Sequence, residues 1–273
     1  MTDRASITSE PGVGAPAADG RDPAVRIVDL VKEFPGGVRA LGGLTFDVPR
    51  GELTSIIGPS GCGKTTTLKI IGGLVDATSG RVDVDGVPVT GPGPDRAFVF
   101  QDFALMPWAT VLRNVAFGLE LRGLPREERE DIARAYVDKV GLSGFEDSYP
   151  HQLSGGMRQR VGLARALAVD ADILLMDEPF ASVDEQIRRQ FQDDLLRLLS
   201  DENKTVIFVT HSIEEAVYVS DQVVLLTRGP SSVSKVVRPG VDRSGSSDEI
   251  RRDPAYLDWV EQIWHELRGY LER

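Results

Sequence analysis

The chain has 273 residues, 41% of them hydrophobic, so it is long and apolar enough to bury a core. The chain contains 31 Lys and Arg and 42 Asp and Glu, and the resulting net charge of −11 argues against nucleic acid or an anionic lipid surface as a partner. The single cysteine excludes an intramolecular disulfide and a four-cysteine zinc site, and it suits a reducing, cytosolic compartment.

The beginning of the chain lacks the apolar core of a secretory signal, and residues 1–24 are expected to form a disordered tail. No apolar run further along approaches the ~20 residues that cross a bilayer. Short apolar runs instead predict β-strands, and the continuous ones are typical of buried, parallel strands. These runs lie at 25–31, 44–48, 53–57, 81–84, 97–100, 173–176, 205–209 and 222–226, with a further candidate at 232–237.

Helical patterns between these runs predict an α/β fold. Residues 101–168 contain no convincing strand, so we expect a mostly helical subdomain there, including an amphipathic helix at 125–140. Residues 229–247 are rich in Gly, Ser and Pro and indicate a surface connection to a last helix. We assign the apolar stripe of that helix to core packing, with a partner or membrane-surface contact as the alternative. The stripe consists of Tyr256, Leu257, Val260, Ile263, Trp264, Leu267 and Leu271.

A phosphate-binding pattern, G-x-x-x-x-G-K-[ST], follows the strand expected at 53–57 and precedes a helical pattern. It reads Gly58-Pro59-Ser60-Gly61-Cys62-Gly63-Lys64-Thr65 and is followed by Thr66. Its glycines let the backbone turn sharply and point N–H groups inward, and the helix adds a positive N-terminal end. We expect Lys64 to reach the β- and γ-phosphates, Thr65 to bind Mg²⁺, and Thr66 to add a phosphate contact, whereas Cys62 contributes only its backbone. The alternative is a glycine-rich turn without a ligand.

Two carboxylates end the apolar run at 173–176, where an open parallel sheet forms its ligand crevice. Asp177 is expected to hold Mg²⁺ through water, and Glu178 to polarise the attacking water as a general base. His211 ends the run at 205–209 in the same way, and we expect it to contact the γ-phosphate. The alternatives are a solvated acidic turn and a structural histidine.

A third motif lies between these two and reads Leu153-Ser154-Gly155-Gly156-Met157-Arg158-Gln159-Arg160. With it, residues 25 to about 226 resemble the ATP-binding cassette family, the ATPase subunits of ABC transporters. The resemblance implies a P-loop cassette with a mixed, mainly parallel sheet over residues 25–228, with the helical subdomain at 101–168 and a C-terminal connection and helix at 229–273. It implies ATP and Mg²⁺ as ligands and a second cassette, expected to be an identical chain, packed head to tail. Ser154, Gly155 and Gly156 would then contact the γ-phosphate bound by the opposite subunit; the alternative is a helix cap without a ligand.

Further site residues follow from the same resemblance. Phe34 matches an aromatic that stacks on adenine, although a core position is the alternative. Gln101 matches the glutamine that joins the Mg²⁺ and water site to the membrane partner, so it counts among both the catalytic and the metal-site residues. Asp184 matches a loop that carries communication between the two nucleotide sites. Two departures, Met157 for the usual Gln and Val183 for the usual Leu, remove no catalytic group.

Residues 101–119 are similar to the ATPases of nitrate, sulfonate and taurine uptake systems. Four large apolar residues there are too many for a solvated loop, and we expect them to line a groove for a helix of an integral-membrane permease, with internal packing as the alternative. They are Phe103, Leu105, Met106 and Trp108. This branch implies a location on the cytoplasmic face of the cell membrane and an indirect link to a solute-binding protein. The other candidates are an importer of another solute class, and an ABC ATPase of DNA repair or the ribosome, which the negative charge disfavours.

Overall fold

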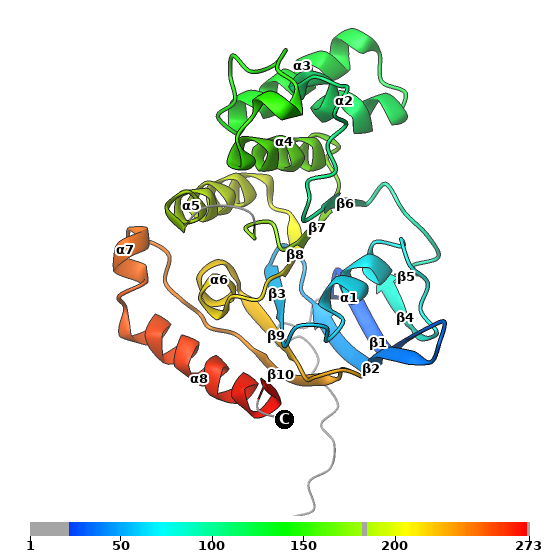
Figure 1. Cartoon of the computed structure of the whole chain (residues 1–273), viewed down its shortest axis with the longest axis vertical. Helices are drawn as coiled ribbons and strands as arrows, with labels where there is room; N and C mark the ends of the chain where they lie inside the picture. The colour runs from blue at the N-terminus through cyan, green and yellow to red at the C-terminus, as the bar shows by residue number, and fades with distance from the viewer. Residues whose placement is uncertain (1–21, 182–184, 272–273) are drawn as a thin grey trace, which may run out of the picture.

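The computed structural model describes residues 22–181 and 185–271, and two β-sheets form its centre (Figure 1). The larger sheet has six strands in the order β10-β9-β3-β8-β7-β6, all parallel except β10, which pairs antiparallel with β9. Its strands are β3 (Leu53–Ile57), β6 (Arg96–Val99), β7 (Ile173–Asp177), β8 (Thr205–Val209), β9 (Gln222–Leu226) and β10 (Val233–Val237). The predicted strands at 53–57, 205–209 and 222–226 are therefore confirmed to the residue.

Residues of the four central strands alternate between two hydrophobic clusters, one on each face of the sheet. In β8, for example, Val206 and Phe208 pack into one cluster, whereas Ile207 and Val209 pack into the other. Because both faces are covered, every position of β3, β7, β8 and β9 is buried. This is the physical reason for continuous apolar runs where a half-exposed sheet would alternate.

One face of the large sheet packs against helix α1 (Lys64–Ile71) and the smaller sheet, whose strands run antiparallel in the order β2-β1-β4-β5. That sheet comprises β1 (Val25–Phe34), β2 (Val38–Val48), β4 (Ser79–Val84) and β5 (Val87–Pro88). Ala24, which the sequence assigned to the disordered tail, is buried and donates its N–H to the carbonyl of Val48 at 2.9 Å. The fold therefore includes Ala24, while residues 1–21 of the expected tail lie outside the described residues.

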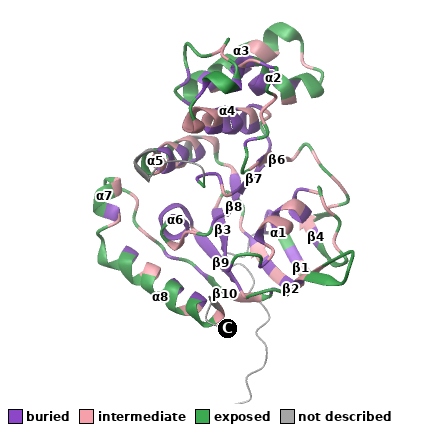
Figure 2. Cartoon of the chain, in the orientation of Figure 1, coloured by how far each residue is buried: buried purple, intermediate pink, exposed green. Residues whose placement is uncertain are grey.

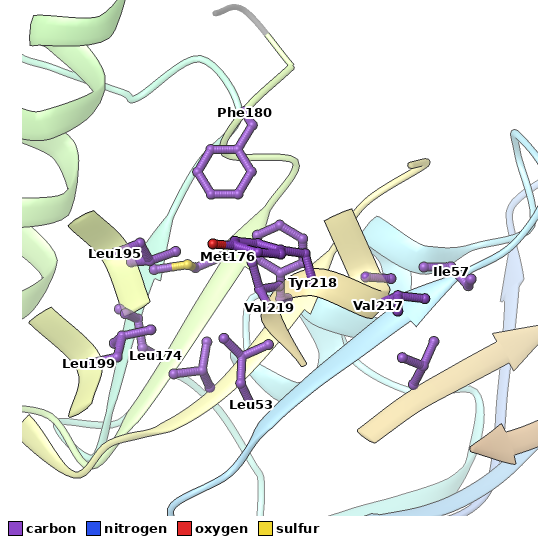
Figure 3. Close-up of a cluster of buried hydrophobic side chains, with 14 of the residues drawn as sticks. Leu53, Ile57, Leu174, Met176, Phe180, Leu195, Leu199, Val217, Tyr218 and Val219 are labelled. Atoms are coloured by element: carbon purple, nitrogen blue, oxygen red, sulfur yellow. The ribbon is translucent and has the colours of Figure 1, made fainter. Parts of the chain in front are cut away.

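The opposite face is covered by α5 (Glu185–Glu202), α6 (Ile213–Val219) and the C-terminal helices α7 (Ser247–Ile250) and α8 (Pro254–Leu271). Figure 3 shows Met176 and Tyr218 among the side chains of this cluster, with Phe180 at its upper edge. The stripe of α8 is only partly core. Tyr256, Ile263 and Leu267 are buried, but Leu257 and Trp264 are exposed. Figure 2 shows α8 with much of its surface exposed.

Three helices at the top of Figure 1 share a third hydrophobic cluster, and the last of them also contributes Leu163, Ala166 and Leu167 to the cluster around Phe180 on the large sheet. They are α2 (Val111–Leu121), α3 (Arg126–Lys139) and α4 (Gly155–Ala168), and the short 3-10 helix η1 (Pro150–Gln152) leads into α4. Between β6 and β7 the described chain contains no strand, as the sequence predicts for this segment. Within the described ranges, no helix has both the length and the apolar character needed to cross a bilayer.

Candidate active site

The carboxyl ends of the parallel strands bring the predicted nucleotide residues to one edge of the sheet. β3 runs into Gly58 and the phosphate loop, β7 ends at Asp177, and β8 leads to His211. Ile56 of β3 and Asp177 of β7 both pair with Val209 of β8, so these three strand ends are level. This is where an open α/β sheet forms its ligand crevice.

The phosphate loop takes a conformation that requires glycine. Gly61 and Gly63 have φ values of +75° and +93°, in the left-handed region that other residues rarely adopt. A Cβ on Gly63 would also lie 2.5 Å from Cδ2 of Leu41. Gly63 caps α1 without any side-chain hydrogen bond, so the first N–H groups of that helix are left to face a ligand.

Lys64 is folded back onto the phosphate loop. Its Nζ donates to the carbonyl of Gly58 at 2.9 Å and to that of Pro59 at 3.2 Å, and the residue is buried. The ammonium group is therefore held at the mouth of the loop by two neutral acceptors. An anionic phosphate would be a stronger partner than either carbonyl.

Thr65 and Asp177 join the phosphate loop to the acidic strand end. The Thr65 hydroxyl donates to Oδ1 of Asp177 at 2.9 Å, across the intervening strand β8. Burial raises the pKa of the Asp177 carboxyl above its ordinary value, and the hydrogen bond from Thr65 acts in the opposite direction. A hydroxyl and a carboxylate in contact are the hard oxygen donors that Mg²⁺ prefers, so this pair fits the ion.

Glu178 and His211 face each other at the ends of β7 and β8. Glu178 has a φ of +46°, and its N–H donates to the carbonyl of Val209 at 2.9 Å, which fixes the turn after β7. Its Oε2 lies 3.2 Å from Nδ1 of His211. The imidazole is 64% exposed and the carboxylate side chain 22%, so both groups remain accessible from the crevice.

The geometry agrees with what comparison with known proteins finds. A model of the ABC transporter family matches residues 41–181. The chain belongs to this family. It is 53% identical to an uncharacterized ABC transporter ATP-binding protein of Methanocaldococcus jannaschii, MJ0412, over 247 residues that cover 89% of this chain and 91% of the relative. It is 46% identical to the taurine import ATP-binding protein TauB of Chromobacterium violaceum over 235 residues, 84% of this chain and 90% of the relative.

A solved structure supports the fold. The ATP-binding cassette MJ0796, in a dimeric post-hydrolysis state bound to ADP and Pi, superposes with a TM-score of 0.71 at 33% identity and covers 78% of this chain and 98% of its own. The predicted fold, a P-loop cassette with a mainly parallel sheet and inserted helices, is therefore confirmed. The protein is an ABC cassette with ATPase activity.

The signature motif of the cassette lies in the helical part, apart from the phosphate loop of the same chain (Figure 1). Ser154 is exposed and caps α4, and its Oγ accepts the N–H of Met157 at 3.3 Å. Gly155 and Gly156 form the first turn of the helix. The same chain therefore does not bring these groups to its own Lys64, which is the arrangement that a head-to-tail pair would need.

The remaining predicted nucleotide residues differ in their surroundings. Phe34 ends β1 and is 37% exposed, with Nζ of Lys32 5.2 Å from its ring centre, so the core alternative is wrong. Gln101 is exposed two residues after β6 ends at Val99. Asp184, with Ser182 and Val183, lies outside the described residues.

The apolar segment predicted as a permease groove is divided between core and surface. Phe103 is buried, and Arg165 of α4 donates to its carbonyl at 2.7 Å. The prediction that its side chain contacts a permease is therefore corrected, because the side chain belongs to internal packing. Leu105 and Met106 are half-buried, and Leu105 packs against the helical cluster. Trp108 is 74% exposed and remains available to a partner.

Asn114, to which sequence analysis gave no role, holds the loop that carries Trp108. Its side-chain amide accepts the N–H of Met106 at 2.8 Å and donates to the carbonyls of Met106, Ala109 and Thr110 at 3.0–3.2 Å. Asn114 is fully buried on α2. An asparagine among Val111, Leu112 and Val115 on the buried side of α2 was the available signal, because a buried amide needs partners.

Cys62 contributes backbone to the phosphate loop but turns its side chain into the core between the two sheets. Burial raises the pKa of its thiol. Because thiolate and access both control alkylation, we expect N-ethylmaleimide to label Cys62 at least ~10-fold more slowly than a free peptide thiol at the same pH. Mass spectrometry would measure this, with the unfolded chain in guanidinium as the control. Labelling at the peptide rate in the folded protein would contradict the buried position.

Proposed function

We propose that the cassette is the ATPase subunit of an importer, in which two identical cassettes bind two MgATP molecules head to tail and drive an integral-membrane permease. The exposed indole of Trp108, outside every nucleotide motif, is the observation that carries the coupling role. Contact with a permease would place the cassette on the cytoplasmic face of the membrane. The solute-binding protein would act through the permease, without touching the cassette.

Nucleotide binding rests on the phosphate loop, residues 58–66. Backbone N–H groups of the loop and of the start of α1 surround the phosphates, and the Lys64 ammonium exchanges its two carbonyl partners for β- and γ-phosphate oxygens. Pro59, Ser60 and Cys62 contribute through their backbone, Thr66 adds a hydroxyl, and Phe34 stacks on the adenine. Ser154 with its two glycines completes the site of the opposite cassette.

Magnesium would be held by Thr65 directly, by Asp177 through water and by Gln101. When bound, the ion neutralises charge on the phosphate oxygens. Glu178 lies at the same edge and accepts a proton from the attacking water as general base. His211 orients that carboxylate through its 3.2 Å contact and contacts the γ-phosphate. Asp184 is proposed to carry communication between the two sites.

The coupling role predicts a selective effect of Trp108→Ala. Truncating an interface aromatic commonly costs ~2 kcal/mol or more, which is about thirtyfold in affinity. The variant should therefore lose co-purification with its permease while keeping its melting temperature and basal ATPase rate. Met106 is half-buried, so Met106→Ala is left out of this test to avoid a change in stability.

Val87→Ala is the matched control, because Val87 is 66% exposed on β5, in the other part of the molecule. It should change neither association nor turnover. If Trp108→Ala is stable, active and still associates with the permease at full affinity, the indole has no coupling role. A lowered melting temperature before any partner is added would assign it to internal packing.

The solute is proposed to be a small anion such as nitrate, an aliphatic sulfonate or taurine. The support is the similarity to TauB, which is named as a taurine import protein, at 46% identity. A reconstituted importer whose ATPase rate rises with taurine, sulfonate or nitrate, but not with an amino acid or sugar, would identify the class. Stimulation by an amino acid or sugar would assign it to another importer branch.

A further inference from the structure

The two neighbours of His211 are tied together by a closed set of hydrogen bonds. The N–H of Ser212 donates to Oγ1 of Thr210 at 3.0 Å, so the backbone folds tightly around His211. The Thr210 hydroxyl in turn donates to Oε2 of Glu215, and the N–H of Glu215 donates to Oγ of Ser212 at 3.2 Å. Three side chains thus fix the backbone on both sides of the imidazole.

This arrangement differs from an ordinary helix cap. In a capping box the glutamate at the third helical position accepts the N–H of the capping residue, which here would join Glu215 to Ser212. Instead Thr210 takes that N–H, and the Glu215 carboxylate is directed to the residue before His211. Capping α6 would not require this detour.

Glu215 is also unusually buried for a charged group. It is 7% exposed in the first turn of α6, and its Oε1 lies 3.8 Å from Nε of Arg188 on α5. Burying a carboxylate costs free energy unless it is paired and hydrogen-bonded, and here the partners are Thr210 and Arg188. The Arg188 contact therefore ties the first turn of α6, next to His211, to α5.

We propose that Thr210 and Glu215 are positioning residues for His211. They hold the backbone of residues 210–212 so that the imidazole meets Glu178 and a γ-phosphate. The inference rests on the role proposed above for His211. Because Lys64 and the phosphate loop lie on a different strand end, loss of this positioning should lower turnover without lowering ATP affinity.

The central variant is Thr210→Val, which keeps shape but removes the hydroxyl. A displacement of about 1 Å at a reacting group can cost up to ~10²-fold in rate, so we expect kcat to fall roughly tenfold or more while KM for ATP stays within about twofold. Thr210→Ser should restore most of the rate, because it keeps the hydroxyl. Basal ATPase activity and a fluorescent nucleotide titration on the full chain measure both quantities.

Tyr218→Phe is the matched control on the same helix. This variant also removes a hydroxyl that donates to a carboxylate, because the Tyr218 hydroxyl donates to Oδ1 of Asp193 at 2.5 Å. Tyr218 lies in the last turn of α6, at the opposite end of the helix from His211. Tyr218→Phe should keep kcat and KM. If Thr210→Val lowers the melting temperature more than this control does, Glu215→Met replaces it, because methionine is of similar size but has no oxygen to accept the Thr210 hydroxyl, and the same loss of kcat is expected.

The double variant with His211→Ala separates this inference from the proposed function. If Thr210 acts through His211, adding Thr210→Val to His211→Ala should cause no further loss of single-turnover rate. A full kcat in Thr210→Val or Glu215→Met, or losses that multiply in the double variant, would overturn the positioning role. A full kcat in His211→Ala alone would instead overturn the role proposed for the histidine.

Discussion

Replacing Glu178 with Gln should stop most ATP turnover and leave ATP binding intact. The amide keeps the size and shape of the side chain, and the backbone bond from Glu178 N–H to the Val209 carbonyl is unchanged, so the turn after β7 should persist. What is lost is the proton acceptor, which typically contributes ~10²- to 10⁴-fold to rate. The expected product is a trapped, ATP-bound dimer that elutes earlier in size-exclusion chromatography.

The control for this variant is Glu261→Gln on α8. Its carboxylate side chain is 72% exposed, on a helix that contributes no residue to the candidate active site, so the same chemical change should leave the rate unaltered. Phosphate release and nucleotide titration are measured on both proteins. Near-normal turnover in Glu178→Gln would mean that another group accepts the proton.

Replacing Lys64 with Ala should act at an earlier step, on nucleotide affinity. The phosphate loop then loses its own side-chain cation, and charge-assisted hydrogen bonds of this kind contribute ~1.5–3 kcal/mol each, roughly 10- to 100-fold in affinity. The carbonyls of Gly58 and Pro59 lose the donor that now occupies them, so the melting temperature is recorded alongside. Titration with a fluorescent ATP analogue gives the affinity.

Lys235→Ala is the companion variant, because it removes one exposed lysine from β10 without touching the loop. Its affinity for ATP should equal that of the parent chain. If Lys64→Ala binds ATP as tightly as Lys235→Ala does, the anion is held by backbone groups alone.

The candidate site at the carboxyl ends of the parallel strands was predictable, because its residues either form one contiguous motif or are brought together by the direction of the strands. The phosphate loop is a contiguous pattern in which Gly63 and Lys64 have fixed neighbours in sequence. The meeting of Thr65 with Asp177, 112 positions apart, follows from parallel strands whose carboxyl ends share an edge. The doubly covered sheet also explains why β3, β8 and β9 could be delimited to the residue.

Other features depend on contacts that no local pattern contains. Phe103 was expected to line a groove, but its side chain is buried, and Arg165 of α4 binds the carbonyls of Phe103 and Ala104 across 61 or more positions of sequence. β2 begins at Val38 instead of residue 44, because residues 38–44 pair with the second half of β1, a contact that the interrupted apolar pattern around Gly42 does not indicate. α5 was not predicted, since its buried face is defined only by the cluster above the sheet.

The role inferred for Thr210 and Glu215 was hidden for a similar reason. In sequence, Ser212 followed three positions later by Glu215 fits an ordinary capping box. The diversion of the carboxylate to Thr210 becomes visible only when the hydrogen bonds are traced. Side-chain direction within a few residues can thus be harder to predict than the pairing of distant strands.

The buried amide of Asn114 has a consequence for how the Trp108 loop would meet a partner. Four hydrogen bonds fix the backbone on both sides of the indole before any partner arrives. Ordering a loop on association normally costs conformational entropy that reduces affinity. In this cassette the loop is already ordered in the folded chain, so little of the free energy gained by burying the indole would be offset by ordering the loop. The complex would then dissociate more slowly than one formed by a flexible loop.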